Sequence, residues 1–293
     1  MSGIPGYQDS LRALVETKPL IAKSLQMAEE RRAQRLADYM NGMRLKGIEQ
    51  LYAYLDTAVV SFTASPEFAD QVFLVCRARA DFETALEATL SGYQGVAADA
   101  MRDVMEIEGL LLDFATHPGN AVEWRNAERK ARMKKFGPAA VRERLKAAGL
   151  PPYSNEHFEP IDYRAHSEAL HVTPPGTRLN DRGPEAPNYP SLFADLGFVE
   201  IFEHGNRILS AIEMTRILGL GVPDDYKPLM PMDDFGAAYE RTQEMQVIMV
   251  AMVEGPQLLK KKLNRVPTAS EVLEYVAGDI QSKSPRASSE DCG

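Results

Sequence analysis

VAADAMRDVMEIEGLLLDFAT, residues 96–116, decides the fold class of this chain. Four of its charged residues fall at offsets of 0, 3, 4 and 7, which places them in one stripe on an α-helix. They are Asp99, Arg102, Asp103 and Glu106. The opposite face carries the apolar side chains of Ala97, Val104, Ile107, Leu111 and Phe114. This pattern predicts a long amphipathic helix with one buried side.

Helical periodicity continues on the N-terminal side of this segment. An apolar-periodic stretch over about 20–62 follows Pro19, a residue suited to the first turn, and we expect Gly47 to bend or break it. Ser65 and Pro66 are typical of a helix start, so a second helix is expected from there to about residue 91.

The C-terminal side is also helical in pattern. Two pieces over about 120–148 are separated by Phe-Gly-Pro at 136–138, and a proline suits the start of the second piece. Further helices are expected over the ranges 191–219, 231–254 and 268–280. No strand alternation and no repeat of fixed period is found, so the sequence predicts an all-α protein.

Four parts of the chain follow from these boundaries. They are a long N-terminal helical segment (1–64), a helical core (65–220) with a Pro-rich loop (173–190), additional C-terminal helices (221–280) and a disordered tail (281–293).

Composition narrows the class of protein. The 44% hydrophobic and 26% charged residues are ordinary for a globular protein, and the net charge of −9 disfavours coating of long nucleic acid by bulk attraction. The longest apolar run, 247–253, is far shorter than the roughly 18 residues of a membrane span. Cys76 and Cys292 form no disulfide framework, and the first ten residues lack a secretory pattern. We therefore expect a cytoplasmic protein with no membrane partner.

IDYRAHSEALH, residues 161–171, holds the candidate catalytic residues. Arg164 and His171 are seven positions apart, which returns both side chains to one face of a helix, two turns apart. A guanidinium can neutralise a phosphate and an imidazole can transfer protons near neutral pH, so the pair could cleave RNA without a metal. Tyr163 and Ser167 share a row with His171, where a hydroxyl can fix the imidazole tautomer.

A structural interpretation of the same helix stays open. The five histidines, with three permitted Arg–His spacings, give roughly one match by chance. Tyr163, Ser167 and His171 can equally form a buried polar row that holds two helices in register. The charged stripe of 96–116 is likewise either a solvated face or an internal polar groove facing Arg164 and His171.

The segment 123–146 is the main basic feature, with nine Lys or Arg residues against three Glu. The candidates for binding RNA or an acidic partner are Arg125, Arg129, Lys130, Arg132, Lys134 and Lys135. Such a run is more often a solvated helix face. Trp124 can stack on a base, and its setting favours an anchor in the core instead.

Metal and cofactor sites are not indicated. The sequence has no pair of Glu-x-x-His motifs that would support a di-iron bundle, no His-Glu-x-x-His motif, no paired cysteines and no glycine-rich phosphate loop, so we expect no metal and no cofactor. Glu203 and His204 are expected at the surface. The Met-rich stretch 243–255 is expected in the core or at an oligomer contact.

Three segments taken in order resemble a group of uncharacterised bacterial helical proteins bordering the HEPN superfamily. They are AMRDVMEIEGLLLDFATHPGNAVEWRN (100–126), KKFGPAAVRERL (134–145) and DYRAHSEALHVTP (162–174). In that group an Arg-x3-Glu helix precedes a tryptophan-bearing segment and a Tyr-x3-Ser-x3-His helix. The matching residues here are Arg102, Glu106, Trp124, Tyr163, Ser167 and His171.

The resemblance covers about residues 65–220 and implies a HEPN-like helical bundle that associates as a homodimer, with Arg164 and His171 near the interface. The spacing of these two residues also lies within the Arg-x4–6-His pattern of HEPN ribonucleases. One residue departs from the family: Ala165 follows the arginine where catalytic members usually carry a polar residue, which weighs against nuclease activity.

Two functional hypotheses remain. The first is a non-catalytic helical interaction protein, homo-oligomeric, with a protein partner. The second is a metal-independent HEPN-type ribonuclease of a toxin or phage-defence kind, with Arg164 binding phosphate and His171 as acid–base.

Overall fold

The computed structural model describes residues 6–40, 42–150, 153, 190–220, 227–244, 259, 262–265 and 271. The chain divides into two compact units, Met1–Tyr239 and Glu240–Gly293. Every regular element in the described ranges is a helix, so the all-α prediction is confirmed.

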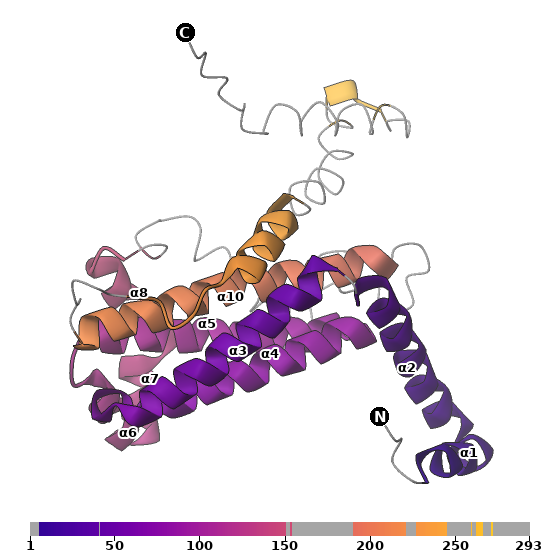
Figure 1. Ribbon diagram of the computed structural model, residues 1–293, viewed down its shortest axis with the longest axis horizontal. Helices are drawn as coiled ribbons and strands as arrows, with labels where there is room; N and C mark the ends of the chain where they lie inside the picture. The colour runs from indigo at the N-terminus through magenta and orange to yellow at the C-terminus, as the bar shows by residue number, and fades with distance from the viewer. Residues whose placement is uncertain are drawn as a thin grey trace. The chain divides into compact units, whose positions relative to one another are not determined.

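The first half of unit 1 contains six helices, four of them long (Figure 1). Their bounds are α1 (Tyr7–Thr17), α2 (Pro19–Tyr39), α3 (Met43–Ala64), the 3-10 turn η1 (Pro66–Phe68), α4 (Val72–Ser91) and α5 (Gln94–Thr116). The predicted helix of 96–116 is therefore α5, and its predicted core residues Ala97, Val104, Ile107, Leu111 and Phe114 are all buried.

Three short helices follow, α6 (Asn120–Asn126), α7 (Arg129–Phe136) and α8 (Pro138–Ala147), and then the long α10 (Pro190–Leu220). Residues 233–239 form the last helical segment of unit 1. In unit 2, residues 240–244 are helical and Arg265 donates a hydrogen bond to Glu271 at 2.9 Å. None of the described helices is long and apolar enough to cross a membrane.

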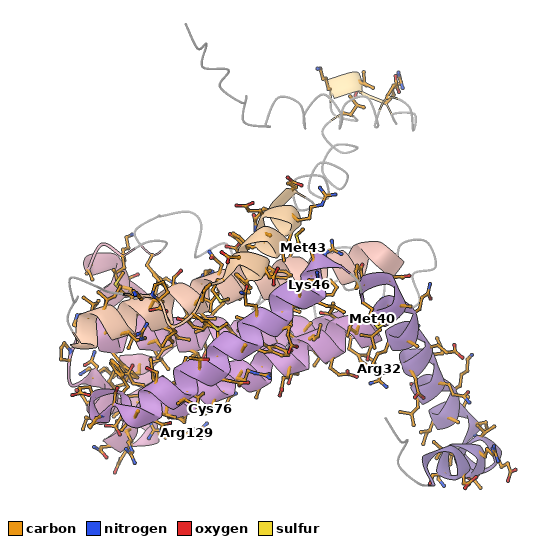
Figure 2. All side chains as sticks on the ribbon, viewed as in Figure 1. Arg32, Met40, Met43, Lys46, Cys76 and Arg129 are labelled. Carbon is orange, nitrogen blue, oxygen red and sulfur yellow. The ribbon has the colours of Figure 1, made fainter. Side chains whose placement is uncertain are left out.

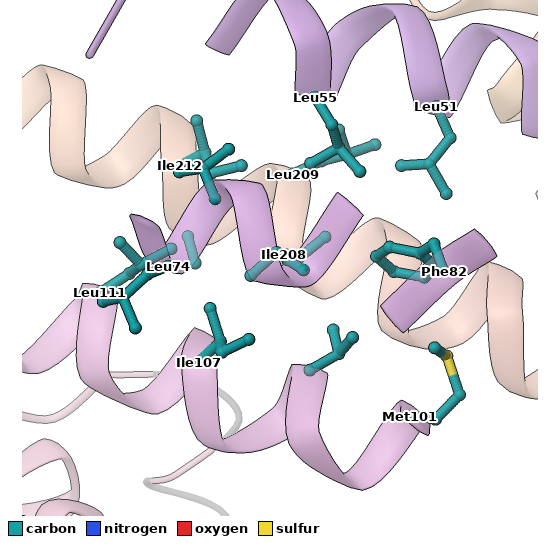
Figure 3. Packing of buried hydrophobic residues seen from close by; sticks show 14 of the residues in the cluster. Leu51, Leu55, Leu74, Phe82, Met101, Ile107, Leu111, Ile208, Leu209 and Ile212 are labelled. Atoms are coloured by element: carbon teal, nitrogen blue, oxygen red, sulfur yellow. The ribbon is translucent and has the colours of Figure 1, made fainter. Parts of the chain in front are cut away.

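The core of unit 1 is built on α5, which packs along both α4 and α10. Helix α4 also contacts α3 and α10, α8 covers α5, and α2 contacts α1 and α4 (Figure 1). Buried apolar side chains converge from four helices (Figure 3): Leu51 and Leu55 of α3, Leu74 and Phe82 of α4, Met101, Ile107 and Leu111 of α5, and Ile208, Leu209 and Ile212 of α10.

Glycines on α10 permit close approach of its neighbours. A Cβ at Gly197 would lie 2.4 Å from Oγ1 of Thr89, and a Cβ at Gly205 would lie 3.0 Å from the ring of Phe235. Neither distance accommodates a side chain without movement of the neighbour. The apolar helix α10 therefore packs closely at these positions because it lacks side chains there.

Three predicted boundaries are wrong. The helix expected from Ser65 and Pro66 begins at Val72, because Pro66–Phe68 form a separate 3-10 turn and the Ser65 side chain does not cap a helix. The predicted N-terminal helix divides into α2, which ends at Tyr39, and α3, which begins at Met43, and Gly47 is buried inside α3. A Cβ on Gly47 would meet Ala238 at 2.7 Å and the ring of Phe202 at 2.9 Å, so this glycine provides space for packing and does not break the helix. The region 120–148 forms three helices instead of two, because Ala127 is extended between α6 and α7.

Candidate functional site

The predicted catalytic residues Tyr163, Arg164, Ser167 and His171 lie outside the described residues, as does most of the Pro-rich loop 173–190. The groups that can be placed are the charged stripe of α5, the basic segment, a buried polar cluster and the exposed face of α2.

The charged stripe of α5 lies beside α4. Arg77 of α4 forms ion pairs with Asp103 and, at 3.8 Å, with Asp81 of its own helix. Arg102 pairs with Glu106 one turn away at 3.1 Å, and both side chains are about one-third exposed. Asp99 is exposed. Three of the four predicted groove residues therefore engage charged neighbours within the described fold.

Two carboxyl groups of this region have raised pKa values. Burial raises the pKa of Asp81 to about 6, with a further contribution from the negative charge of Asp103 and an opposing one from Arg77. Oδ2 of Asp81 is buried and accepts no hydrogen bond from a described residue. Burial also raises the pKa of Glu106, and Arg102 opposes this shift. The stripe is thus a partly desolvated network between α4 and α5.

Half of the predicted RNA-binding residues have partners within the protein. Arg125 pairs with Asp70, and Lys135 pairs with Glu123. The guanidinium of Arg132 donates hydrogen bonds to the carbonyl oxygens of Trp124 at 2.9 Å and Ala127 at 2.7 Å. These carbonyls end α6, where a helix leaves acceptors unsatisfied, so Arg132 caps that helix.

The other three candidates, Arg129, Lys130 and Lys134, are exposed on α7. None of them forms an ion pair with a described residue. Figure 2 places Arg129 at the edge of the side-chain display, near the position of α6 and α7 in Figure 1. These three cations are the part of the basic segment that faces solvent.

Trp124 anchors α6 against α4 and α5, in agreement with the role that the sequence favoured. Its indole stacks on Phe73 of α4 with ring centroids 5.2 Å apart and planes at 11°, and it also contacts Phe114 of α5. The guanidinium of Arg132 lies 5.2 Å from the indole centroid. These contacts use the ring for packing between helices.

Arg144 of the basic segment forms a buried ion pair with Asp113 of α5. Its Nε and a terminal nitrogen donate to the two carboxylate oxygens at 2.7 and 2.8 Å, and Asn120 donates to the same carboxylate at 3.0 Å. Arg144 also donates to the carbonyl oxygen of Lys135 at 2.7 Å. The Asp113 side chain is fully buried, so this junction joins α5, α6, α7 and α8 from the inside.

A second buried polar cluster connects α5 to α10. Glu108, 2% exposed, accepts a hydrogen bond from Tyr153 at 3.1 Å and pairs with Arg207 at 2.9 Å. His204 is 1% exposed and lies 3.4 Å from Glu200. Burial raises the pKa of Glu108, and the charge of Arg207 is the main opposing influence. The prediction that His204 lies at the surface is wrong, because α10 turns it into the core.

Sequence reasoning missed this cluster, although Glu108 interrupts the apolar run of Ile107 to Leu112. A charge within an apolar face needs a buried partner, and this was the available signal. A cavity of about 40 Å³ adjoins Tyr153 between α5 and α8. It has room for about one water molecule, whereas small-molecule sites enclose several hundred Å³. No group of acidic, His or Cys side chains in the described ranges is arranged to hold a metal.

Helix α2 and its C-cap residue carry an exposed apolar stripe. It consists of Ile21, Leu25, Leu36 and Met40, which are 53%, 49%, 37% and 66% exposed. Their offsets of 0, 4, 15 and 19 fall within roughly 100° around a helix, so they share one face. Figure 2 labels Met40 near the end of α2.

The face of α2 that contacts α4 is polar by contrast. Arg35, which is buried, donates hydrogen bonds to the carbonyl oxygens of Thr89 at 2.6 Å and Leu90 at 3.1 Å. Burial lowers the pKa of Arg35. These carbonyls belong to the last turn of α4, whose dipole favours a cation. The contact of α2 with α4 thus depends on arginine, while leucine, isoleucine and methionine of α2 and its C-cap are exposed.

Comparison of the chain with protein-family models, with curated proteins and with solved structures finds no match. Function is therefore inferred from the residues and their geometry alone.

Proposed function

We propose that this chain is an all-helical interaction protein that functions as a homo-oligomer. The observation that supports this most strongly is the exposed apolar stripe of α2, because four large apolar side chains on one helix face are typical of an association surface. An isolated exposed leucine needs no explanation, whereas two exposed apolar pairs on one helix face, one near each end of α2, do.

The polar groups of unit 1 support the same proposal. Asp113 and Glu108 are buried ion-pair partners of Arg144 and Arg207, and each pair joins two or more helices. Buried charges in such pairs are costly to expose and fix the relative position of helices. These residues serve as internal connections of a rigid bundle, which is the property that a binding scaffold requires.

The experiment is light scattering of the full chain over a range of concentrations. We expect a dimer of about 65 kDa, twice the 32.5 kDa of one chain. A Leu25→Glu variant should shift the mass to that of the monomer with unchanged helical circular dichroism, because Leu25 is half exposed in the single chain. The matched control is Leu20→Glu, since Leu20 is 82% exposed and lies on another face of α2. A parent chain that is monomeric at every concentration would refute the proposal.

The second candidate is a metal-independent ribonuclease with a HEPN-like bundle, in which Arg164 binds phosphate and His171 acts as acid–base. The described feature that favours it is the exposed basic group Arg129, Lys130 and Lys134 on α7, which can contact a nucleic-acid backbone. The test is cleavage of a mixed RNA pool in EDTA by the parent and by His171→Ala. Cleavage by the parent alone supports this function, and equal results for both proteins exclude His171 as its catalyst.

A further inference from the structure

We propose that two copies of this chain pack through α2 as an antiparallel helix pair, in which residue i of one copy lies opposite residue 61 − i of the other. This inference rests on the proposed function and specifies the partner, the surface and the register. It is carried by the sequence of α2 together with the exposure of its side chains.

The apolar stripe is self-complementary in this register. Leu25 lies opposite Leu36 of the other copy, and Ile21 lies opposite Met40. Because both chains contribute both members, each contact occurs twice around the two-fold axis, as an isologous interface requires. The exposed fractions of 37–66% leave these four side chains accessible for contact.

The centre of the stripe is complementary in charge. Between Leu25 and Leu36, the same face of α2 carries Glu29 and Arg32, and 29 and 32 also add up to 61. In the antiparallel pair each Glu29 therefore lies opposite Arg32 of the other copy. In a parallel pair in register, Glu29 would face Glu29 and Arg32 would face Arg32. Opposite charges favour the antiparallel arrangement, and like charges disfavour the parallel one.

Small residues flank the same centre. The residue numbers of Ala28 and Ala33 also add up to 61, so Ala28 of one copy lies opposite Ala33 of the other. The two alanines lie on either side of the stripe. Alanine on both flanks allows the two helix axes to approach closely, while Glu29 and Arg32 fill the space between them. The two apolar pairs, the charged pair and the alanine pair thus share one register.

Within the described residues this face is used in part by the chain itself, since Tyr39 packs on Phe198 of α10, whereas Leu25 and Leu36 stay exposed. Helix α2 contacts α4 through Arg35, which lies on a different side of the helix from Leu25 and Leu36. Arg32 is shared between the two environments, because it pairs with Glu87 of its own chain and still keeps 39% of its side chain exposed. Figure 2 labels Arg32 and Met40 along α2. In the pair, Arg32 would lie between Glu87 and the Glu29 of the other copy.

Disulfide trapping tests the register directly. Cys76, which is exposed, and Cys292 are first replaced by serine. Leu25→Cys and Leu36→Cys variants are then oxidised separately and as a mixture. In the proposed pair, residue 25 lies opposite residue 36, whereas two copies of residue 25 are separated by 11 residues, about 16 Å along the axis. Disulfides require Cα atoms within about 7 Å, so only the mixture should form a cross-linked dimer.

A matched control applies the same pairing rule to two residues on the opposite face of α2. Lys23 and Asp38 also add up to 61 but lie on the opposite side of α2 from the apolar stripe. A mixture of Lys23→Cys and Asp38→Cys should give at least tenfold less cross-linked dimer than the mixture of Leu25→Cys and Leu36→Cys. Equal yields would show random collision and overturn the register.

The outcomes separate this inference from the proposed function. A parent dimer by light scattering with cross-links between two copies of residue 25 would overturn the antiparallel register and leave the interaction protein standing. A parent dimer that persists in Leu25→Glu would place the interface elsewhere on the chain. A monomeric parent refutes both.

Discussion

Replacing Arg144 by leucine tests the most extensively bonded ion pair of the core. The Asp113 carboxylate is fully buried and accepts three hydrogen bonds, two of them from Arg144 at 2.7 and 2.8 Å and one from Asn120 at 3.0 Å. The variant keeps the bond from Asn120 and the 3.4 Å contact between Nδ1 of His117 and the carboxylate, but leaves the buried charge without its arginine. Removal of one partner of a buried ion pair costs about 3–5 kcal/mol. Arg144 itself is 24% exposed, so we expect the lower end of that range.

The assay is urea unfolding followed by helical circular dichroism at pH 7. With a slope of about 3 kcal/mol per molar urea, a loss of about 3 kcal/mol lowers the midpoint by about 1 M. The double variant Asp113→Leu with Arg144→Leu should recover part of the loss, because no uncompensated charge remains. Arg129→Leu is the control, since Arg129 is exposed on α7 and its replacement should change stability by less than about 0.5 kcal/mol. A loss below about 1 kcal/mol for Arg144→Leu would refute the reasoning.

Three further predictions concern α4 and its neighbours. Because burial raises the pKa of Asp81 to about 6, the folded state holds a proton between about pH 4 and pH 6 that the unfolded state has lost, so stability falls as the pH rises through that window. Asp81→Asn should remove this decline, and urea midpoints that still fall equally between pH 4 and pH 7 would contradict it. Gly197→Ala places a Cβ 2.4 Å from Oγ1 of Thr89 and should cost about 1–3 kcal/mol, seen as a lower Tm; an unchanged Tm would show that the contact relaxes freely. Arg35→Met removes the cap on the last turn of α4, so backbone amides of α2 should exchange hydrogen faster while those of α5 stay unchanged; equal acceleration in both helices would indicate global destabilisation instead.

The sequence predicted the helices well where periodicity is local. Helix α5 is the clearest case. The pattern of charged and apolar residues within 96–116 is enough to predict both of its faces, without knowledge of contacts to remote residues. The break between α2 and α3 was predicted at the wrong position, because it depends on contacts between remote residues. Gly47 has the local signature of a break, but its surroundings come from Phe202 and Ala238, which lie far away in the chain.

The polar residues were harder to predict because their partners are remote. Arg207 is separated from Glu108 by 99 positions, and no periodicity connects them. The basic segment shows the opposite difficulty. Arg125 and Arg132 belong to a positive run in the sequence, but in the fold Arg125 pairs with Asp70 before α4 and Arg132 binds carbonyl oxygens at the end of α6. A run of basic residues in the sequence does not show which of them form ion pairs within the fold. Only the charges that remain exposed and unpaired can form a binding surface.

Helix α2 reverses the usual relation between polarity and burial. A helix on the surface of a bundle normally buries leucine and exposes arginine. Here Arg35 is 8% exposed, while Leu25 and Met40 are 49% and 66% exposed. The carbonyl oxygens at the end of α4 account for the buried arginine, because they need a donor and favour a cation. Nothing within the described chain accounts in the same way for the apolar stripe. A second copy of α2 does so, since it buries the leucines and brings Glu29 opposite Arg32 in a single register. A helix that buries an arginine and exposes leucine and methionine is therefore best explained as one half of an interface.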